Sequence, residues 1–363
     1  MDYGAFSKNG RRKPDMKIVA ALNLNSIEPR VWNAVSDYHL SELKAVMISY
    51  AYFHQNPTRR RRVMEEGVHT SLSIPESMSI YLDNGAFRFS RVGGEVPREE
   101  YKAFVKAAKP DWYAIPQDYI PSPRMSYYKQ NKCLEKTMAV NQEFSYDGYV
   151  PILHVSRCLN KYIRLFDENE KLRKKPIFAI GGIVPNLLRA PKAMSHKKIL
   201  NSLYRVRETF ANQKLHLFGV GGTSTLHVAA LLKMDSVDSV GWRARAARGL
   251  IQLPGSGERT VVKLGNWRGR EPDAQEWDVL KECKCPACQK YGIEGLKKDK
   301  TFGFCNRATH NLWTLLEENR MIQENLEAGT YAEWYKEHLR NSTYRPLIDQ
   351  LVEKHLKQND NTG

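Results

Sequence analysis

Short apolar runs alternate with longer stretches of helical spacing over the first 250 residues. A typical stretch between two runs places Tyr101, Phe104, Val105 and Ala108 on one face of a predicted helix. Strands that alternate with helices in this way are expected to run parallel in one sheet. The eight apolar runs are Lys17–Leu24, Ala45–Tyr50, Ser79–Asp83, Trp112–Pro116, Tyr149–His154, Pro176–Ile180, Lys214–Phe218 and Val237–Val240.

The number of runs predicts an α/β fold, and specifically a (β/α)8 TIM barrel. A doubly wound open sheet is the structural alternative that the same pattern leaves open. After residue 250 the pattern changes, because residues 260–308 show little periodicity and a strong helical pattern resumes only from Thr309. We therefore expect the barrel over residues 1–252, a subdomain with a closing helix over residues 253–330, and a helical tail over residues 331–363.

The charge balance favours a polyanionic partner. Lys and Arg number 56 against 40 Asp and Glu, which gives a formal net charge of +16. The chain shows no apolar run of the roughly 18 residues that a membrane helix needs, and its N-terminus lacks the apolar core of a signal peptide. We expect a cytoplasmic protein without a membrane partner. The clearest basic run is Arg59, Arg60, Arg61 and Arg62, and further basic clusters are Arg11–Lys13 and Arg173–Lys175.

Three of the six cysteines fall within six residues, which is typical of a metal site rather than of disulfides. The spacing of Cys283, Cys285 and Cys288 places three thiolates on one turn around a single ion, most simply a structural Zn²⁺. Either Cys305 or His310 is in reach as the fourth ligand. The predicted architecture is thus a barrel with a zinc-binding subdomain after strand eight.

Candidate chemistry lies at the ends of the predicted strands, because the catalytic groups of such barrels stand at the C-terminal ends of strands. One aspartate there is more often a helix cap than a catalyst, and only the whole set of residues indicates a catalytic site. Two carboxylates across one mouth suit glycosidic chemistry, in which one attacks carbon and the other moves protons. Glycines there let a flat ligand approach the backbone closely. The residues are Asp83, Asp118, His154, Gly181, Gly182, Gly219 and Asp238.

These strand ends and the cysteine spacing resemble the tRNA-guanine transglycosylase superfamily over about residues 79–324. That resemblance implies a zinc-bearing (β/α)8 barrel that exchanges guanine in a nucleic acid for a 7-deazaguanine base. It also selects His310 over Cys305 as the fourth zinc ligand. The motifs, in chain order, are Leu82–Phe87, Ala179–Ile183, Leu217–Gly221, Met234–Val240, the Cys-x-Cys-x2-Cys element and His310-Asn-Leu312.

The resemblance further implies roles for the carboxylates and for the residues around the base. Asp238 resembles the nucleophile that attacks C1′, expels guanine and holds a covalent intermediate, and Asp83 resembles the general base. Asp118 matches the carboxylate that contacts the amino and ring N–H edge of the base. Other matches are Gly181, Gly182 and Gly219 beside the base, Phe87 and Phe218 on its two faces, and Arg243 and Arg245 at the polynucleotide backbone.

Two departures from the family pattern point to a divergent branch. The chain has Asp83-Asn84-Gly85-Ala86 where the family usually has Asp-Ser-Gly-Gly, and His154-Val-Ser-Arg157 where it usually has Val-Gln-Gly-Gly. His154 is thus expected at the position of a glutamine that contacts the base. The RNA-binding domain of archaeal relatives has no counterpart in this sequence. These differences resemble the DpdA-type DNA-guanine transglycosylases of phages and bacterial modification clusters, which insert a 7-deazaguanine such as preQ0 into DNA.

Our leading interpretation of the sequence is therefore a DNA-guanine transglycosylase with DNA and a 7-deazaguanine as partners. A phage-encoded protein of this kind works in the host cytoplasm, and Arg59–Arg62 is a candidate for backbone contact. The target guanine must leave the duplex stack, so a homodimer or an accessory protein that opens DNA is compatible with this interpretation. The alternatives are a tRNA-guanine transglycosylase, a non-catalytic partner subunit and a Mg²⁺-dependent nuclease.

Overall fold

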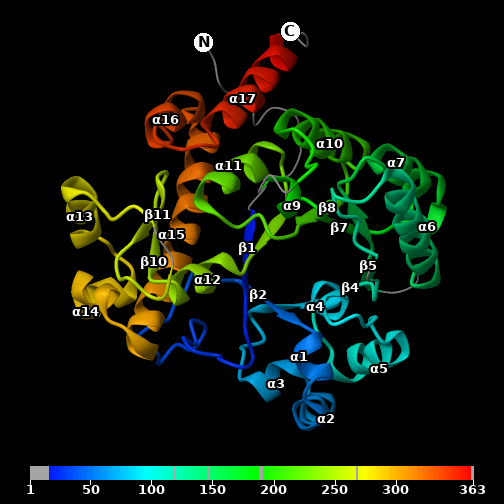
Figure 1. The fold of residues 1–363 in the computed structure, drawn as a ribbon, viewed down its shortest axis with the longest axis horizontal. Helices are drawn as coiled ribbons and strands as arrows, with labels where there is room; N and C mark the ends of the chain where they lie inside the picture. Colours follow the sequence, from blue (N-terminus) through cyan, green and yellow to red (C-terminus); the bar gives the residue numbers. More distant parts are fainter. Residues whose placement is uncertain (1–15, 118, 146–147, 188–190, 267–268, 361–363) are drawn as a thin grey trace.

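The fold is a nearly closed parallel barrel surrounded by helices (Figure 1). The computed structural model describes residues 16–117, 119–145, 148–187, 191–266 and 269–360. Its main sheet has the strand order β5-β4-β3-β2-β1-β9-β8-β7-β6, with parallel pairing throughout. The strands are β1 Lys17–Ala21, β2 Ala45–Ser49, β3 Ser79–Asp83, β4 Trp112–Ala114, β5 Tyr149–Val150, β6 Ile152–His154, β7 Ile177–Gly181, β8 Lys214–Leu217 and β9 Ser236–Ser239.

The barrel closes through one short segment, because the two edge strands β5 and β6 are consecutive in the chain. Pro151 separates them and has no backbone N–H to donate. The carbonyl of Pro151 still accepts a hydrogen bond from Ala179 N on β7 (2.9 Å). The carbonyl of Val150 accepts one from Ile115 N beside β4 (3.0 Å). The predicted fifth run therefore forms two strands with different neighbours. The barrel prediction is confirmed, and the open-sheet alternative is wrong.

The helices around the barrel bury the faces that their sequence patterns predict. In α7, for example, Leu159, Tyr162, Ile163 and Phe166 lie at positions i, i+3, i+4 and i+7 and are all buried. The helices from β2 to the end of the barrel are α1 Ala51–His54, α2 Pro57–Glu66, α3 Val68–Leu72, α4 Ala86–Arg91, α5 Arg98–Ala108, α6 Tyr127–Glu143, α7 Leu159–Glu168, α8 Glu170–Arg173, α9 Val184–Leu187, α10 His196–Thr209, α11 Thr223–Leu231 and α12 Gly241–Ala247.

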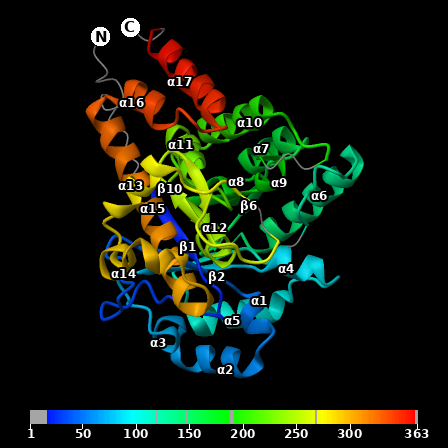
Figure 2. The ribbon, with the colours of Figure 1, turned by 60° about the vertical axis from the view of Figure 1, so that its left-hand side comes forward.

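The segment after the barrel contains more regular structure than its sequence pattern predicts. A hairpin of β10 (Leu250–Leu253) and β11 (Gly257–Thr260) leads to α13 (Ala274–Lys281) and α14 (Pro286–Lys297). The long helix α15 (Lys300–Ala328) begins nine residues before the expected start at Thr309. Figure 2 shows α15 beside β1, with α13 and α14 outside it. Two further helices, α16 (Tyr331–His338) and α17 (Arg345–Asp360), follow.

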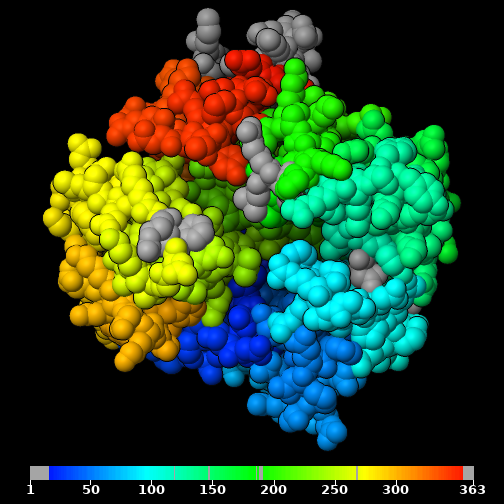
Figure 3. All heavy atoms as spheres, in the orientation of Figure 1, coloured from blue at the N-terminus to red at the C-terminus, as the bar shows by residue number. Residues whose placement is uncertain are grey.

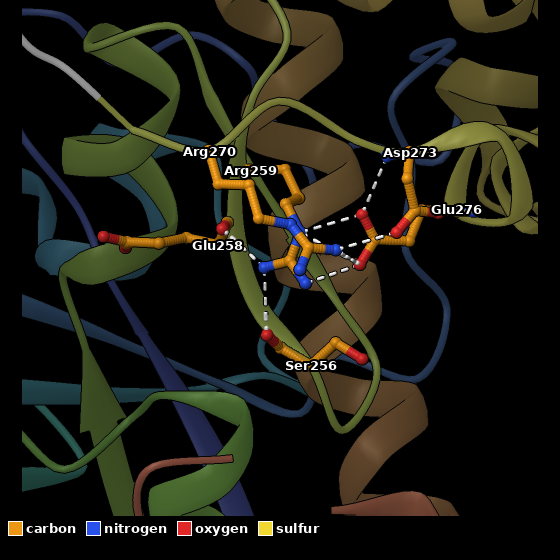
Figure 4. Close-up of polar contacts among 6 residues, drawn as sticks. All are labelled: Ser256, Glu258, Arg259, Arg270, Asp273 and Glu276. Atoms are coloured by element: carbon orange, nitrogen blue, oxygen red, sulfur yellow. Dashed lines mark hydrogen bonds and ion pairs between the residues drawn. The ribbon is translucent and has the colours of Figure 1, made fainter. Parts of the chain in front are cut away.

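An arginine network attaches α13 to the hairpin (Figure 4). The guanidinium of Arg259 on β11 donates to both carboxylate oxygens of Glu276 on α13, at 2.5–3.0 Å, and Arg270 donates to the same carboxylate at 2.6 Å. Glu276 also caps the helix reciprocally with Asp273. Burial opposes ionisation of Glu276, but the two guanidinium groups outweigh it and hold its pKa at about 2.

Two apolar cores divide the molecule. The larger core fills the barrel and its helices, and it continues into α15, α16 and α17 through Leu315, Tyr335 and Leu351. The smaller core contains the three clustered cysteines together with residues of β10, α13 and α14. Among the described residues, no helix is long and apolar enough to cross a membrane.

Candidate active site

Asp238 on β9 is a buried carboxylate held by the neighbouring strand end. Its side chain is on the same strand face as Ser236, and the residue is only 7% exposed. The backbone N–H of Gly219, directly after β8, donates to Asp238 Oδ1 at 2.6 Å. The imidazole of His216 on β8 lies below it, with Nε2 3.5 Å from the same oxygen. The residue predicted as nucleophile thus sits at a barrel strand end with one oxygen fixed.

Asp83 at the end of β3 lies close enough to Asp238 for their charges to interact. Its Oδ2 accepts a hydrogen bond from Gly85 N at 3.1 Å. Burial raises the pKa of Asp83 to about 6, and the negative charge of Asp238 adds to this, while Gly85, Ser49 and His216 act in the opposite direction. A carboxyl group with a pKa near 6 can both give and take a proton near neutral pH. The structure therefore brings the two predicted aspartates within range of each other's charge, and it places Asp83 where burial raises its pKa.

Asn84 explains how the loop after β3 keeps its shape without the serine that the family usually has there. Its side-chain amide donates to the carbonyls of Ile115 (2.7 Å) and Gln117 (2.9 Å) after β4, and its oxygen accepts from Ala86 N (2.9 Å). All three bonds are made by a buried side chain. The departure at this position thus ties two strand ends together beside Asp83.

His154 at the end of β6 lies against Gly181 of β7, its partner in the parallel register. A methyl group placed on Gly181 would come within 3.2 Å of the imidazole, so the glycine makes room for this ring. His154 Nε2 lies 3.4 Å from the amide nitrogen of Gln117. Burial lowers the pKa of His154 to about 4, so the ring is neutral at physiological pH. Its Nδ1 is buried and has no protein partner among the described residues.

Two of the predicted glycines have backbone geometry that disfavours a side chain. Gly182 and Gly219 have φ angles of +76° and +73°. A Cβ on Gly182 would lie 2.9 Å from the carbonyl of Val155, and one on Gly219 would lie 2.6 Å from the side chain of Val184. Close approach of neighbouring loops therefore requires glycine at both positions.

The two aromatic residues predicted to sandwich the base lie in different surroundings. Phe218 is half-buried and packs on His216 (4.8 Å between ring centroids) and Trp112 (6.1 Å). Phe87, in the first turn of α4, is 62% exposed, and Arg91 lies over its ring at 4.3 Å. Figure 3 shows this face hollowed at its centre, beside the cyan residues around α4. Phe218 is thus held by packing against neighbouring rings, while the ring of Phe87 is exposed at the start of α4.

Among the predicted phosphate contacts, Arg243 is a correction. Its guanidinium is buried and donates to the carbonyls of Glu28 (2.6 Å) and Ser26, so it holds the 26–28 loop and presents no surface to a polyanion. Arg245 is partly exposed and pairs with Glu258 at 2.6 Å. Asp118 and Arg11–Lys13 lie outside the described residues.

The four consecutive arginines lie on α2, in the outer ring of helices at the lower edge of Figure 1. Arg60 pairs with Glu100 of α5 at 2.5 Å, and Arg62 pairs with Glu66 at 3.1 Å. Arg59 is partly buried and Arg61 is exposed. Two of these four charges are therefore already engaged within the protein.

The predicted metal ligands form one compact buried group of Cys283, Cys285, Cys288 and His310. The three sulfur atoms lie 3.4, 3.8 and 3.5 Å from Nδ1 of His310, close to the ~3.5 Å separation expected around a tetrahedral Zn²⁺. The other ring nitrogen, Nε2, lies 2.9 Å from the carbonyl of Gln252, which fixes the ring. Cys305 is buried elsewhere on α15. The group could hold a metal ion with all four positions filled by protein.

A second group of ligand-type side chains is held by hydrogen bonds instead. His227, Glu318 and His338, which we call the α15 clamp, place both imidazole Nε2 atoms 2.7–2.8 Å from Glu318 Oε1. These are hydrogen-bond distances, shorter than the separations in the cysteine group. The α15 clamp joins α11, α15 and α16.

Sequence reasoning missed His216 and Gln117. His216 lies in an apolar run, and this pattern predicts a strand position and not a site residue. Its signal is the period of two along β8, which places His216 on the same barrel-facing side as Phe218 and one layer below it. Gln117 directly precedes Asp118, and only its contact with His154 reveals it.

Fold and site define an α/β barrel with two interacting carboxylates at its mouth and a Cys3His group beyond it. A family model described as queuine tRNA-ribosyltransferase matches residues 25–344. The chain therefore belongs to the queuine tRNA-ribosyltransferase family.

Curated relatives carry the name tRNA-guanine(15) transglycosylase. The chain is 26% identical to the protein of Methanosarcina barkeri over 333 residues, which cover 84% of this chain and 59% of the relative. It is 24% identical to that of Methanocaldococcus jannaschii over 352 residues, covering 93% and 50%. The chain thus spans between half and three-fifths of the length of these relatives.

Proposed function

We propose that this protein is a guanine transglycosylase that exchanges a base in a nucleic acid through a covalent intermediate on Asp238. The observation that carries the proposal is the pair of interacting carboxylates Asp83 and Asp238 at the ends of β3 and β9. Family membership supports the reaction type, and the different surroundings of the two carboxylates support a distinct task for each. A partner subunit without catalysis would not need both groups.

The proposed reaction has two displacements at the same carbon. Asp238 forms a C1′–O bond as the C1′–N9 bond of guanine breaks, and the leaving base takes a proton from protonated Asp83. The incoming base then gives its ring proton to the Asp83 carboxylate and forms the new C1′–N bond, which releases Asp238. Protons balance over the cycle, and two inversions give net retention at C1′.

For the polynucleotide, tRNA is the first substrate that we propose. The relatives reported above are named as tRNA enzymes, which favours this alternative over the DNA substrate that we expected from the sequence. Asn84 and His154 depart from the usual family pattern, and because of these departures DNA is tested as the second substrate. In either case the charge of +16 favours a polyanion.

For the incoming base, we propose that His154 replaces the amide that the family usually presents. Its neutral ring leaves Nδ1 without a protein partner at the site. If Gln117 donates to Nε2, then Nδ1 carries the proton and can donate to an acceptor on a base. A 7-deazaguanine with an acceptor group at the 7-position, such as the nitrile of preQ0, fits this chemistry.

The test measures incorporation of labelled guanine and labelled preQ0 into tRNA and into duplex or single-stranded DNA. We expect incorporation into tRNA by the wild type and none by Asp238→Asn. On denaturing electrophoresis, the wild type should form a protein–nucleic acid adduct, and Asp238→Asn should form none. Incorporation only into DNA would restore the DNA interpretation, and metal-dependent cleavage without incorporation would overturn the transglycosylase proposal.

We also propose that the Cys3His group binds Zn²⁺ in a structural role. Its four ligands leave no position for substrate, and they lie in the small core of the subdomain and not at the barrel mouth. The metal would therefore fix α14 and α15 to the hairpin, and the reaction would depend on it through folding.

A further inference from the structure

The polar layer directly below the two aspartates is built around His216, which the proposed reaction does not yet use. The side chain is 1% exposed and is enclosed by the rings of Tyr81, Trp112 and Phe218, with centroid distances of 4.8–5.6 Å. Burying an imidazole among aromatic rings is unfavourable unless its nitrogens find partners. The contacts of Nδ1 and Nε2 therefore indicate what this residue does.

The first nitrogen of His216 is engaged from below. Nδ1 lies 2.8 Å from the hydroxyl oxygen of Ser236 on β9. Ser236 is two residues before Asp238, so both side chains face the barrel interior. The hydroxyl of Ser236 also interacts with the phenol of Tyr81 on β3. If Tyr81 donates to Ser236 and Ser236 donates to Nδ1, every donor in the chain has an acceptor.

That arrangement puts the ring proton on Nε2, which points at the nucleophile. Nε2 is buried, lies 3.5 Å from Asp238 Oδ1, and makes no closer hydrogen bond within the described part of the chain. A separation of 3.5 Å is longer than a strong N–H···O bond, but catalytic hydrogen bonds are often long without substrate and tighten in the complex. Asp83 is a second carboxylate near this ring, since His216 acts on the pKa of Asp83.

The two oxygens of Asp238 are therefore not equivalent. Oδ1 receives the N–H of Gly219 at 2.6 Å and faces His216 Nε2. Over the described residues, no hydrogen bond reaches Oδ2. An oxygen that accepts from two donors is a poorer nucleophile than one with free lone pairs. Because Oδ1 is held in place, the direction in which Oδ2 points is also fixed.

We propose that His216 is a positioning residue that, in its Nε2–H form, fixes Oδ1 of Asp238 together with Gly219 and leaves Oδ2 to attack C1′. This inference rests on the proposed function for the identity of the attacked carbon. The tautomer and the contact with Asp238 do not depend on it. The hydroxyl of Ser236, at His216 Nδ1, would set the tautomer of the imidazole, because the ring nitrogen opposite the functional one determines where the proton lies.

The kinetic test uses His216→Phe, His216→Gln and Ser236→Ala. Phenylalanine keeps the aromatic packing but removes both nitrogens, so we expect kcat for base exchange to fall about 10–100-fold with KM little changed. Glutamine can donate its amide to Asp238 and should recover part of that loss. Ser236→Ala should show a smaller loss. An unchanged kcat in His216→Phe, with folding intact by circular dichroism, would overturn the proposal.

A spectroscopic test separates this inference from the proposed function. In the full-length protein labelled with ¹⁵N-histidine, the His216 signal, assigned by its absence in His216→Gln, should show the Nε2–H tautomer and should shift in Asp238→Asn. A Nδ1–H tautomer, or no response to Asp238→Asn, would refute the positioning role. If the wild type exchanges no base, the proposed function fails, while this measurement still decides the contact.

Discussion

Two carboxyl groups in this protein, one partly exposed and one fully buried, have opposite electrostatic surroundings. Asp83 stands at the barrel mouth near a second carboxylate, and burial together with that charge raises its pKa to about 6. Glu318 on α15 is fully buried, yet the imidazoles of His227 and His338 outweigh the burial and hold its pKa at about 2. The backbone N–H of Gly255 completes the set of donors at 3.0 Å.

The difference separates a carboxylate that serves structure from one whose protonation can change near neutral pH. Glu318 has its donors in place and gains nothing from a change of protonation, so it holds α11, α15 and α16 together. Asp83 is left with too few donors and a like charge nearby, which weakens the fold but keeps the proton mobile. We therefore expect substitutions at the two sites to change stability in opposite directions.

The largest expected effect comes from the Cys3His group, which shares α15 with the α15 clamp. Cys283→Ser should abolish zinc binding, and because such binding contributes about 10–16 kcal/mol in small zinc domains, α13 and α14 should lose their order. Metal analysis and hydrogen exchange would report this. Cys305→Ser is the matched control, because Cys305 is also buried but lies outside the group. Equal zinc content in wild type and Cys283→Ser would contradict the assignment.

Glu318→Gln should be the most damaging single change in the α15 clamp. The amide cannot accept both imidazole N–H groups at full strength, and removal of one partner from a buried charged network costs about 3–5 kcal/mol. We expect a clear fall in Tm with unchanged zinc content. The neighbouring Glu317→Gln is the control, because Glu317 forms a surface pair with Arg320, a type of pair worth about 0–1 kcal/mol. Similar losses in both variants would refute the clamp.

Asp83→Asn should stabilise the protein while it abolishes base exchange. Removing a partly exposed carboxylate whose pKa is raised from 3.8 to about 6 should stabilise the protein by about 1–3 kcal/mol at pH 7.5. Thermal melting would show the gain. Asp278→Asn, at an exposed pair with Lys281, should change Tm little and serves as control. A destabilised Asp83→Asn would mean that the ionised form is better accommodated than its surroundings indicate.

The effects of Asp83→Asn and Glu318→Gln on stability should depend on pH in opposite ways, and this is the smallest of the expected effects. The raised pKa of Asp83 means that its contribution to stability is fully present below pH 3.8 and is lost as pH rises through 6, so the gain in Asp83→Asn should vanish near pH 3.5. The lowered pKa of Glu318 means that its contribution is present above pH 4.5 and is lost as pH falls towards 2, so the cost of Glu318→Gln should shrink there. Melting curves at pH 3.5, 5.5 and 7.5 would detect both trends, and parallel curves would contradict them.

Local sequence pattern predicted the barrel well because each strand carries its own signal. Ser79–Asp83 matches β3 residue for residue, and other strands differ at their ends. The pattern failed where structure depends on distant partners. Residues 274–297 form α13 and α14 around the cysteine group and the Arg259 network, so their helical faces are short and their burial is not periodic.

Candidate residues at strand ends were predictable, but their partners were not. Asp83 and Asp238 follow from the barrel rule that strand ends meet at one mouth. The contact of Arg243 with the 26–28 loop joins segments more than 200 residues apart, so the residues next to Arg243 in the chain give no sign of it. A guanidinium after a catalytic strand therefore resembles a phosphate ligand in sequence, while in the structure it is part of the core.

Buried arginines also change how the positive charge of this protein should be counted. Arg307 on α15 is fully buried and donates to the carbonyls of Ala246 and Leu296, at the ends of α12 and α14, while Arg243 and Arg259 are likewise internal. These three cations can release no counterions from a polynucleotide, because they never reach its phosphates. The slope of binding affinity against salt concentration should therefore reflect the exposed cations alone, and fall below what the net charge of +16 suggests.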